Sequence, residues 1–280
     1  MRYRLPELMK SFSVAMGAEL AGIVAQRSGS SPQLAGALRY CVSTPGKCLR
    51  AFLAGTIAKI FGVAEARFFP MCAAIEAIHT YSLVHDDMPC MDDAATRRGK
   101  ASCHCEYGEA MALLVGDSLL TLAFELLSAM EEDCTVKCEI IKVISRACGC
   151  SGMAAGQALD MEGKADSQLE AVKRIHELKT ACLFAAACES GAILAGASDD
   201  TRETLAAYGK ALGCAFQAQD DLNDVGEDVR RPNIVNVLGA DGTAKYVDSL
   251  LHQCEAHLES LNADTVVLKE LVMFVRNLSL

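Results

Sequence analysis

Two clusters of acidic residues stand out in this chain because each follows a long apolar segment. The first reads DDMPCMDD at residues 86–93, and the second reads DDLND at residues 220–224. Burying unpaired carboxylates is very costly, so apolar segments rarely carry bunched acids unless something compensates their charge. Two carboxylate clusters facing each other across a cavity would bind several hard divalent cations through oxygen ligands. The pattern predicts a site that handles a diphosphate.

The spacing inside each cluster fits ion binding. In the second cluster, Asp220 and Asp224 lie four residues apart and share a helix face, with Asp221 beside them. A solvated acidic helix end is the alternative. Acids at a helix C-terminus oppose the helix dipole, however, so two such ends need another cause.

The first cluster contains a turn signal. Asp86 and Asp87 close an apolar helix, and Pro89 then disfavours further helix. Asp92 and Asp93 follow the turn. This order places loop carboxylates beside helix-end carboxylates, which suits ions bridged between them.

Basic residues complete the predicted site. Lys47 and Arg50 lie three apart at an expected helix start, where phosphates bind readily. Arg97 and Arg98 follow the first acidic cluster directly, and adjacent side chains point in different directions. Each arginine could therefore hold a different diphosphate. Lys179 lies within a further helical stretch.

Helical periodicity recurs from end to end, and no segment shows sustained strand alternation. The predicted helices cover residues 5–26, 31–40, 47–61, 65–88, 106–130, 135–149, 151–162, 167–196, 201–225 and 243–278. Residues 65–88 and 205–219 are apolar on nearly all sides, which is typical of core helices. No linker divides the chain. We therefore predict one all-α domain over residues 1–280, a bundle of about ten or more helices around a central cavity.

Composition narrows the function classes. The chain is 51% hydrophobic with no Trp, which favours helix, and its net charge of -10 argues against a nucleic-acid binder. The 14 cysteines include no C-x-x-C pair, so most are expected to be reduced thiols in a cytoplasmic protein. No signal peptide is evident, and no membrane span is expected.

These residues resemble the trans-prenyltransferases, the polyprenyl diphosphate synthase family, and most of all its short-chain bacterial farnesyl diphosphate synthases. The likeness runs over nearly the whole chain in the family's order. The matching elements are 45–51, 76–82, 86–92 with 97–99, 108–110 with 116–117, 156–160, 176–180 and 216–224.

The resemblance implies an isoprenoid synthase-like bundle and a role for each matching residue. About three Mg²⁺ ions, or Mn²⁺, would bridge the aspartates to an allylic diphosphate. The implied metal residues are Asp86, Asp92 and Asp220, supported by Asp87, Asp221 and Asp224. The implied contacts of the allylic diphosphate are Arg97, Lys179, Thr180 and Gln217. The implied contacts of isopentenyl diphosphate are Lys47, Arg50, His79 and Arg98.

The implied activity is head-to-tail condensation of isopentenyl diphosphate with dimethylallyl or geranyl diphosphate to give farnesyl diphosphate, by an enzyme that is a homodimer in this family. Tyr81 precedes Asp86 by five residues, roughly 7–8 Å along a helix. Its ring, with Ser82 beside it, would close the pocket after about three isoprene units, although it could simply be a core tyrosine. Geranylgeranyl or geranyl diphosphate synthase remains the alternative.

The chain departs from the family pattern at two places. Cys48 and Ala51 stand where the family has Arg and Pro, so the grip on isopentenyl diphosphate is expected to be weaker. After Asp224 the usual Gly-Lys loop is shortened, and Arg231 is the residue that could replace the family's second Lys. The lid over the allylic diphosphate is therefore in doubt.

Three other functions fit less well. A terpene cyclase needs a second motif that fails here, because position 227 is Glu and position 231 is Arg. A di-iron bundle needs two Glu-x-x-His motifs, and the chain has one, Glu76 to His79. A non-catalytic regulatory subunit typically lacks aspartates that are complete in this chain.

Overall fold

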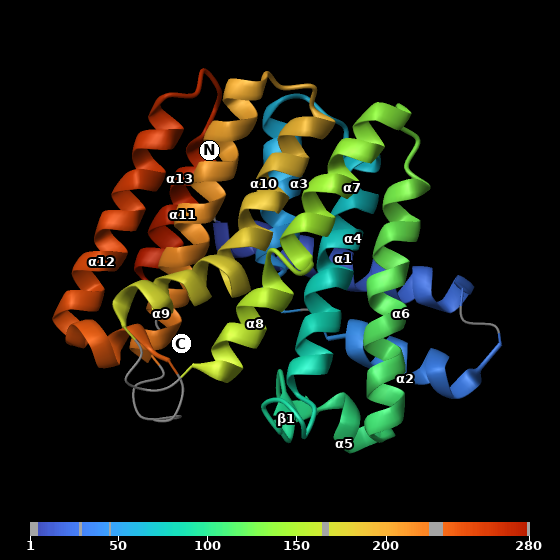
Figure 1. Cartoon of the computed structure of the whole chain (residues 1–280). Coiled ribbons are helices and arrows are strands. Elements are labelled where there is room, and N and C mark those ends of the chain that lie inside the picture. Colours follow the sequence, from blue (N-terminus) through green and yellow to red (C-terminus); the bar gives the residue numbers. More distant parts are fainter. Residues whose placement is uncertain (1–4, 28–29, 45, 164–167, 224–231, 279–280) are drawn as a thin grey trace. The chain divides into compact units, whose positions relative to one another are not determined.

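The computed structural model describes residues 5–27, 30–44, 46–163, 168–223 and 232–278. These residues are helical almost throughout, which confirms the predicted all-α class (Figure 1). The chain forms two compact units. Unit 1 comprises residues 1–52 and 65–137, and unit 2 comprises residues 53–64 and 138–280. The expected single domain over residues 1–280 stays a prediction.

Unit 1 holds the first acidic cluster at the end of its most buried helix. Its elements are α1 (Leu5–Arg27), α2 (Pro32–Val42), the start of α3 (Leu49–Ile60), α4 (Glu65–Asp86), β1 (Thr96–Arg97), β2 (Lys100–Ala101), α5 (Cys103–Tyr107), α6 (Glu109–Ser128) and the start of α7 (Cys134–Cys148). Residues 71–78 of α4 are all buried, as expected for an apolar core helix. Gly116 of α6 faces His85 of α4, where a Cβ atom would lie 2.0 Å from the imidazole Nε2.

The chain after the first acidic cluster forms a hairpin that the sequence did not predict. Thr96 pairs with Ala101 and Arg97 pairs with Lys100, so Arg98 and Gly99 form a two-residue turn. Both turn residues have positive φ, 53° and 76°. Two such residues in succession give the type I′ geometry that matches strand twist. The strands are two residues long each, too short to show as alternation in the sequence.

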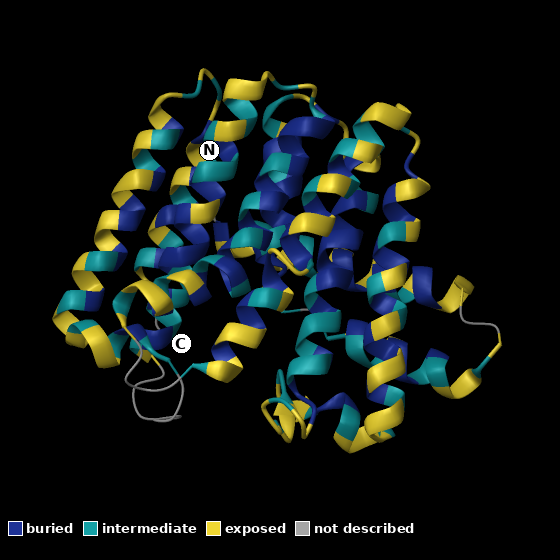
Figure 2. Ribbon diagram, viewed as in Figure 1, coloured by how far each residue is buried: buried dark blue, intermediate teal, exposed yellow. Residues whose placement is uncertain are grey.

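Unit 2 holds the second acidic cluster at the end of α11. Its elements are the rest of α3 and α7, α8 (Met153–Glu162), α9 (Leu169–Ile175), a π-helical segment (His176–Ala181), α10 (Cys182–Leu194), α11 (Asp199–Asn223), α12 (Ile234–Glu259) and α13 (Val266–Arg276). In α11 the Tyr208 hydroxyl, fully buried, donates to the carbonyl oxygen of Leu268 in α13 at 3.0 Å. Buried residues recur along the length of both α10 and α11 (Figure 2).

One predicted helix was wrong in extent, and another was right in extent but contains a segment of a different helix type. Instead of the expected helix 243–278, α12 begins at Ile234, where the Asn233 side chain caps the backbone N–H of Val235 at 2.7 Å, and a non-helical Gly239 (φ 69°, ψ 168°) interrupts it shortly before the expected start. It then breaks between Glu259 and Val266. The expected helix 167–196 contains the π-helical segment in its middle, which periodicity cannot detect because a π turn adds only one residue.

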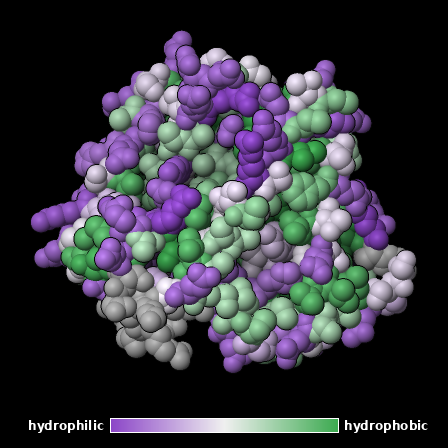
Figure 3. All heavy atoms as spheres, in the orientation of Figure 1, coloured by the Kyte–Doolittle hydropathy of each residue, from purple (hydrophilic) through white to green (hydrophobic). Residues whose placement is uncertain are grey.

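By length and composition alone, α1 and α6 could cross a membrane. From the sequence we expect no membrane span. In the most apolar windows of the two helices, 33% and 44% of residues are buried inside the protein. A core helix meets the same criteria, so the finding is weak support for a span. On the face shown in Figure 3, hydrophilic and hydrophobic residues are intermixed.

All fourteen cysteines are free thiols, as the sequence predicted. Seven of them are buried, Cys48, Cys72 and Cys188 among them, and behave as small apolar side chains.

Candidate active site

The loop after α4 returns to the helix end, as the turn at Pro89 predicted. The backbone N–H of Asp92 donates to the carbonyl oxygen of Asp86 at 2.9 Å, and that of Ala94 donates to Asp87 at 3.1 Å. These bonds keep the loop beside the helix terminus. Asp86 is half-buried and Asp92 is exposed. The backbone thus brings together the two residues expected to share metal binding.

Asp87 has an internal partner. Arg97 donates from Nε to Asp87 Oδ1 at 2.9 Å and to Oδ2 at 3.2 Å, and its terminal nitrogen also pairs with Oδ1. The hydrogen bond that Arg97 donates to this carboxylate raises the pKa of Arg97. Asp87 is 2% exposed, whereas the Arg97 side chain is 39% exposed. The buried acid therefore fixes an arginine whose other face is open, which suits Asp87 to support rather than direct binding.

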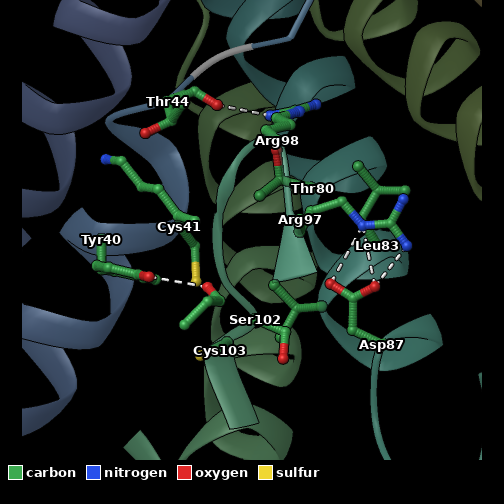
Figure 4. Close-up of a pocket in the computed structure, with 13 residues that line it drawn as sticks. Tyr40, Cys41, Thr44, Thr80, Leu83, Asp87, Arg97, Arg98, Ser102 and Cys103 are labelled. Carbon is green, nitrogen blue, oxygen red and sulfur yellow. Dashed lines mark hydrogen bonds and ion pairs between the residues drawn. The ribbon is translucent and has the colours of Figure 1, made fainter. Parts of the chain in front are cut away.

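Arg98 points away from Arg97, as expected for adjacent residues (Figure 4). Its guanidinium donates to the carbonyl oxygen of Thr44 at 2.9 Å and lies 3.8 Å from Glu76. Glu76 is 1% exposed. Burial raises the pKa of Glu76, and the positive charges of Arg98 and Arg50 counter this. The positive charge of Arg98 therefore helps to compensate the buried carboxylate of Glu76 within unit 1.

His79 and Arg50 form the neighbouring pair. A terminal nitrogen of Arg50 lies 3.3 Å from Nε2 and 3.4 Å from Nδ1 of His79. Burial, together with the charges of Arg50, Arg98 and Arg97, holds the pKa of His79 well below its usual range. A neutral imidazole can donate one hydrogen bond and adds no charge. Lys47 is exposed, close in sequence to this pair.

Cys48, at the position where the family has Arg, is buried and has a positive φ of 48°. Burial raises the pKa of its thiol to about 12, so it carries no charge. A neutral side chain therefore lies beside Lys47, at the position where the family has a cation.

A small cavity of about 40 Å³ lies among α2, the end of α4 and the hairpin (Figure 4). Its walls include Thr80, Asp87, Arg97 and Arg98. A space of this size holds water rather than a diphosphate. Sequence reasoning missed its other wall, which Tyr40, Cys41 and Cys103 contribute, because no local signal links these distant positions.

Tyr81 lies on α4 one helical turn before His85, and the two rings pack edge to face at 5.9 Å. Tyr81 is half-buried. Ser82 is bonded within its own helix, because its hydroxyl donates to the carbonyl oxygen of His79 at 3.0 Å. Of the two, Tyr81 is the better candidate for closing a pocket.

In unit 2, Lys179 is paired with Asp160. The ammonium Nζ lies 2.6 Å from Oδ2 of Asp160 on α8. The π-helical segment can approach α8 closely because residue 156 is glycine: a Cβ there would lie 2.1 Å from the backbone nitrogen of Lys179. The side chain of Lys179 remains 27% exposed. Its partner Asp160 lies in the family-like element 156–160, for which the sequence predicted no role.

The second acidic cluster is bonded into the helices around it. Thr180 donates to Oε1 of Gln217 at 2.7 Å, and Nε2 of Gln217 donates to Oδ1 of Asp221 at 3.2 Å. Asp220 is half-buried and Asp221 is buried. Two predicted residues, Asp224 and Arg231, lie outside the described residues.

The donor set of both clusters fits Mg²⁺, since it consists of carboxylate oxygens. Among the described residues, no three His, Cys, Asp or Glu side chains gather closely enough to hold a metal ion by themselves. One reason is that Asp87 and Asp221 turn to internal partners. In unit 1 a magnesium ion would depend on Asp86 and Asp92, and in unit 2 on Asp220, in each case together with oxygens of a substrate, as Mg²⁺ commonly does with phosphates.

A family model described as polyprenyl synthetase matches residues 31–241. This span includes every predicted site residue. The chain belongs to the polyprenyl synthetase family. The similar proteins of this family are prenyltransferases, which confirms the enzyme class that the motifs predicted.

Curated relatives include enzymes with different products. The farnesyl diphosphate synthase of Escherichia coli is 42% identical over 195 residues, covering 67% of this chain and 64% of that one. Geranylgeranyl pyrophosphate synthase 11 of Arabidopsis thaliana is 39% identical over 201 residues, covering 69% of this chain and 56% of that one.

Solved structures match nearly the whole chain. A farnesyl/geranylfarnesyl (FPP/GFPP) synthase from Zymomonas mobilis has a TM-score of 0.88 at 32% identity, covering 96% of this chain and 99% of that one. The geranyltransferase of Helicobacter pylori, in complex with magnesium and isoprenyl diphosphate, has a TM-score of 0.80 at 31% identity, covering 95% and 96%. The fold is that of these synthases.

Proposed function

We propose that this chain is a magnesium-dependent farnesyl diphosphate synthase. It condenses isopentenyl diphosphate with dimethylallyl diphosphate, and then with geranyl diphosphate. The observation that carries the proposal is the arrangement after α4. Arg97 is fixed by buried Asp87 with one face open, beside Asp86 and the returning Asp92. A rigid cation next to acidic metal ligands is what a departing diphosphate requires.

The chemistry has two steps. The allylic C–O bond breaks, and the diphosphate leaves with the bonding electrons. The double bond of isopentenyl diphosphate then attacks the allylic carbon, and a proton passes from the new cation to the released diphosphate. Arg97 and Lys179 supply positive charge to the leaving group. Apolar helix faces give the carbocation weakly nucleophilic surroundings.

Bound magnesium would neutralise charge on the departing diphosphate and hold its oxygens in place. In support, the similar Helicobacter pylori enzyme was solved with magnesium and isoprenyl diphosphate. We assign Asp86, Asp92 and Asp220 as ligands, with Asp224 as a supporting residue. The number of ions and the use of Mn²⁺ are parts of this proposal.

Isopentenyl diphosphate is assigned to Lys47, Arg50, His79 and Arg98. Cys48 is neutral, and Arg98 is shared with Glu76. We therefore expect a KM for isopentenyl diphosphate higher than in relatives with a second arginine at this position. Each missing charge-assisted hydrogen bond is worth about 1.5–3 kcal/mol, roughly 10- to 150-fold.

Product length is assigned to Tyr81, which is half-buried on α4 one turn and a half before Asp86. An aromatic ring at this depth favours fifteen carbons. Geranylgeranyl synthases among the relatives keep the twenty-carbon product as the second candidate. A homodimer in the cytoplasm is the assembly and location we expect.

One assay tests the proposal. The purified protein is incubated with Mg²⁺, dimethylallyl diphosphate and isopentenyl diphosphate, and the dephosphorylated products are separated by chain length. Farnesol as the main product is expected. Geranylgeraniol would move the assignment to the longer-chain synthases. No product alone, combined with a change in the products of a partner synthase, would establish a regulatory subunit instead.

A further inference from the structure

Four side chains join the π-helical segment to α11 in unit 2, and together with the helix backbone they form a ring. His176 and Thr180 lie four residues apart on one side, and Gln217 and Asp221 lie four apart on the other. Three contacts link the side chains: Thr180 to Gln217 at 2.7 Å, Gln217 to Asp221 at 3.2 Å, and Nε2 of His176 to Oδ2 of Asp221 at 3.3 Å. The backbone between His176 and Thr180 completes the ring, which connects the two helices at two points.

Asp221 also accepts a bond from a third element. The backbone N–H of Ile234, the first residue of α12, donates to Oδ2 at 2.8 Å. Both carboxylate oxygens of Asp221 are thus occupied by donors of unit 2. Asp221 and His176 are 7% and 3% exposed. Burial by itself would raise the pKa of Asp221, but the bonds from His176, Ile234 and Gln217 outweigh burial, and the pKa lies below its usual value.

The amide of Gln217 is engaged at both ends. Its oxygen accepts from Thr180, and its nitrogen donates to Asp221. A side chain held in this way has a fixed orientation and a reduced capacity to grip a substrate. Two residues that flank the ring have assigned roles: Lys179, beside Thr180, contacts the leaving diphosphate, and Asp220, beside Asp221, binds metal.

We infer that Asp221 is an internal acceptor rather than a metal ligand, and that His176 and Asp221 are positioning residues that fix Lys179 and Asp220 through the ring. This inference rests on the proposed function for the roles of Lys179 and Asp220. It assigns His176 a part in the reaction that its sequence motif did not reveal.

His176 acts through one atom. Among the described residues its Nδ1 has no hydrogen-bond partner, so Nε2 makes the contact that matters. His176→Gln supplies an N–H donor at a similar reach, whereas His176→Leu fills the space without a donor. The pair separates loss of the hydrogen bond from loss of volume.

The experiment compares Asp221→Asn with its matched neighbour Asp220→Asn. Thermal unfolding is measured without magnesium, and again with Mg²⁺ and inorganic diphosphate. Asp221→Asn should lower the Tm of the magnesium-free protein by about 5 °C, because an amide cannot accept from three donors, and should keep most of the stabilisation by Mg²⁺ and diphosphate. Asp220→Asn should lower the magnesium-free Tm less than Asp221→Asn does, and it should lose that stabilisation.

The two His176 variants supply the second measurement. His176→Leu should lower the magnesium-free Tm by a few degrees and reduce kcat by about tenfold, with the KM for isopentenyl diphosphate unchanged. His176→Gln should recover most of both losses.

Two results would overturn the inference. One is an Asp221→Asn protein with the wild-type Tm and no response to Mg²⁺ and diphosphate, since that is the behaviour of a ligand. The other is a His176→Leu protein identical to wild type in Tm and kcat. The magnesium-free Tm values need no substrate, so they test the ring even if the wild-type protein fails to make a prenyl product.

Discussion

The Asp86-Asp87 pair of unit 1 and the Asp220-Asp221 pair of unit 2 have the same sequence but different internal partners. In both pairs the second aspartate is buried and bonded inward. Asp87 is neutralised by the guanidinium of Arg97, and Asp221 accepts from an imidazole, an amide and a backbone N–H. The first arrangement fixes a cation that remains open to a ligand, whereas the second fixes two helices. The comparison shows that, of two adjacent acids on one helix, the second can be a buried anchor while the first is only half-buried.

The largest expected effect separates the two members of the first pair. Asp86→Ala should reduce kcat by at least about 100-fold, because it removes a carboxylate assigned to the metal ions that hold the leaving diphosphate. Asp87→Asn should instead cost about 1.5–3 kcal/mol of stability, since Arg97 loses its charged partner. Steady-state kinetics and denaturant unfolding measure the two. Full activity of Asp86→Ala would remove this residue from the metal assignment.

The next largest effect is expected at two glycines, Gly156 and Gly116, that allow neighbouring groups to approach closely. Gly156→Ala places a Cβ 2.1 Å from the backbone nitrogen of Lys179, and Gly116→Ala places one 2.0 Å from the imidazole of His85. A side chain can rotate and a backbone cannot, so we expect about 3 kcal/mol of destabilisation at Gly156 and about 1 kcal/mol at Gly116. Urea unfolding measures both. Only Gly156→Ala should also lower kcat, through displacement of Lys179; equal losses at the two sites would contradict this difference.

Tyr81→Ala tests whether unit 1, which contains Tyr81, sets product length by itself. Removing the ring should deepen the pocket and shift the products from fifteen toward twenty carbons. Tyr81→Phe keeps the ring and serves as the control. Chain-length analysis of dephosphorylated products is the readout. An unchanged distribution in Tyr81→Ala, or a shift caused equally by variants in unit 2, would reject Tyr81 as the residue that closes the pocket.

The smallest effect concerns the pH dependence of unit 1. The pKa of His79 lies well below its unfolded value of 6.5. Below pH 6.5 the unfolded chain therefore binds a proton that the folded protein does not, so this contribution to stability is present above pH 6.5 and is lost as pH falls. The loss is less than about 1.4 kcal/mol per pH unit, because a half-buried ring is partly solvated. His79→Gln should show a shallower decrease in Tm from pH 7.5 to pH 5.5. Glu76 is unchanged in both proteins, so parallel curves would show that His79 is not the titrating group.

Sequence alone determined the all-α class, the polyprenyl synthase resemblance and the identity of the acidic and basic residues. These follow from periodicity and from residue types at short spacing, which are local properties. It also predicted the return of the chain from Pro89 to Asp92, because proline acts on its immediate neighbours.

Only the tertiary structure decided which acid of each pair faces inward. Residues 86 and 87 have the same side chain, and Asp87 takes its role because Arg97, ten residues later, pairs with it. Likewise His176, Gln217 and Ile234 meet at Asp221 from three separate elements. Periodicity assigns a residue to a helix face, but the partner on that face comes from chain packing over long sequence distances, and no short pattern encodes it.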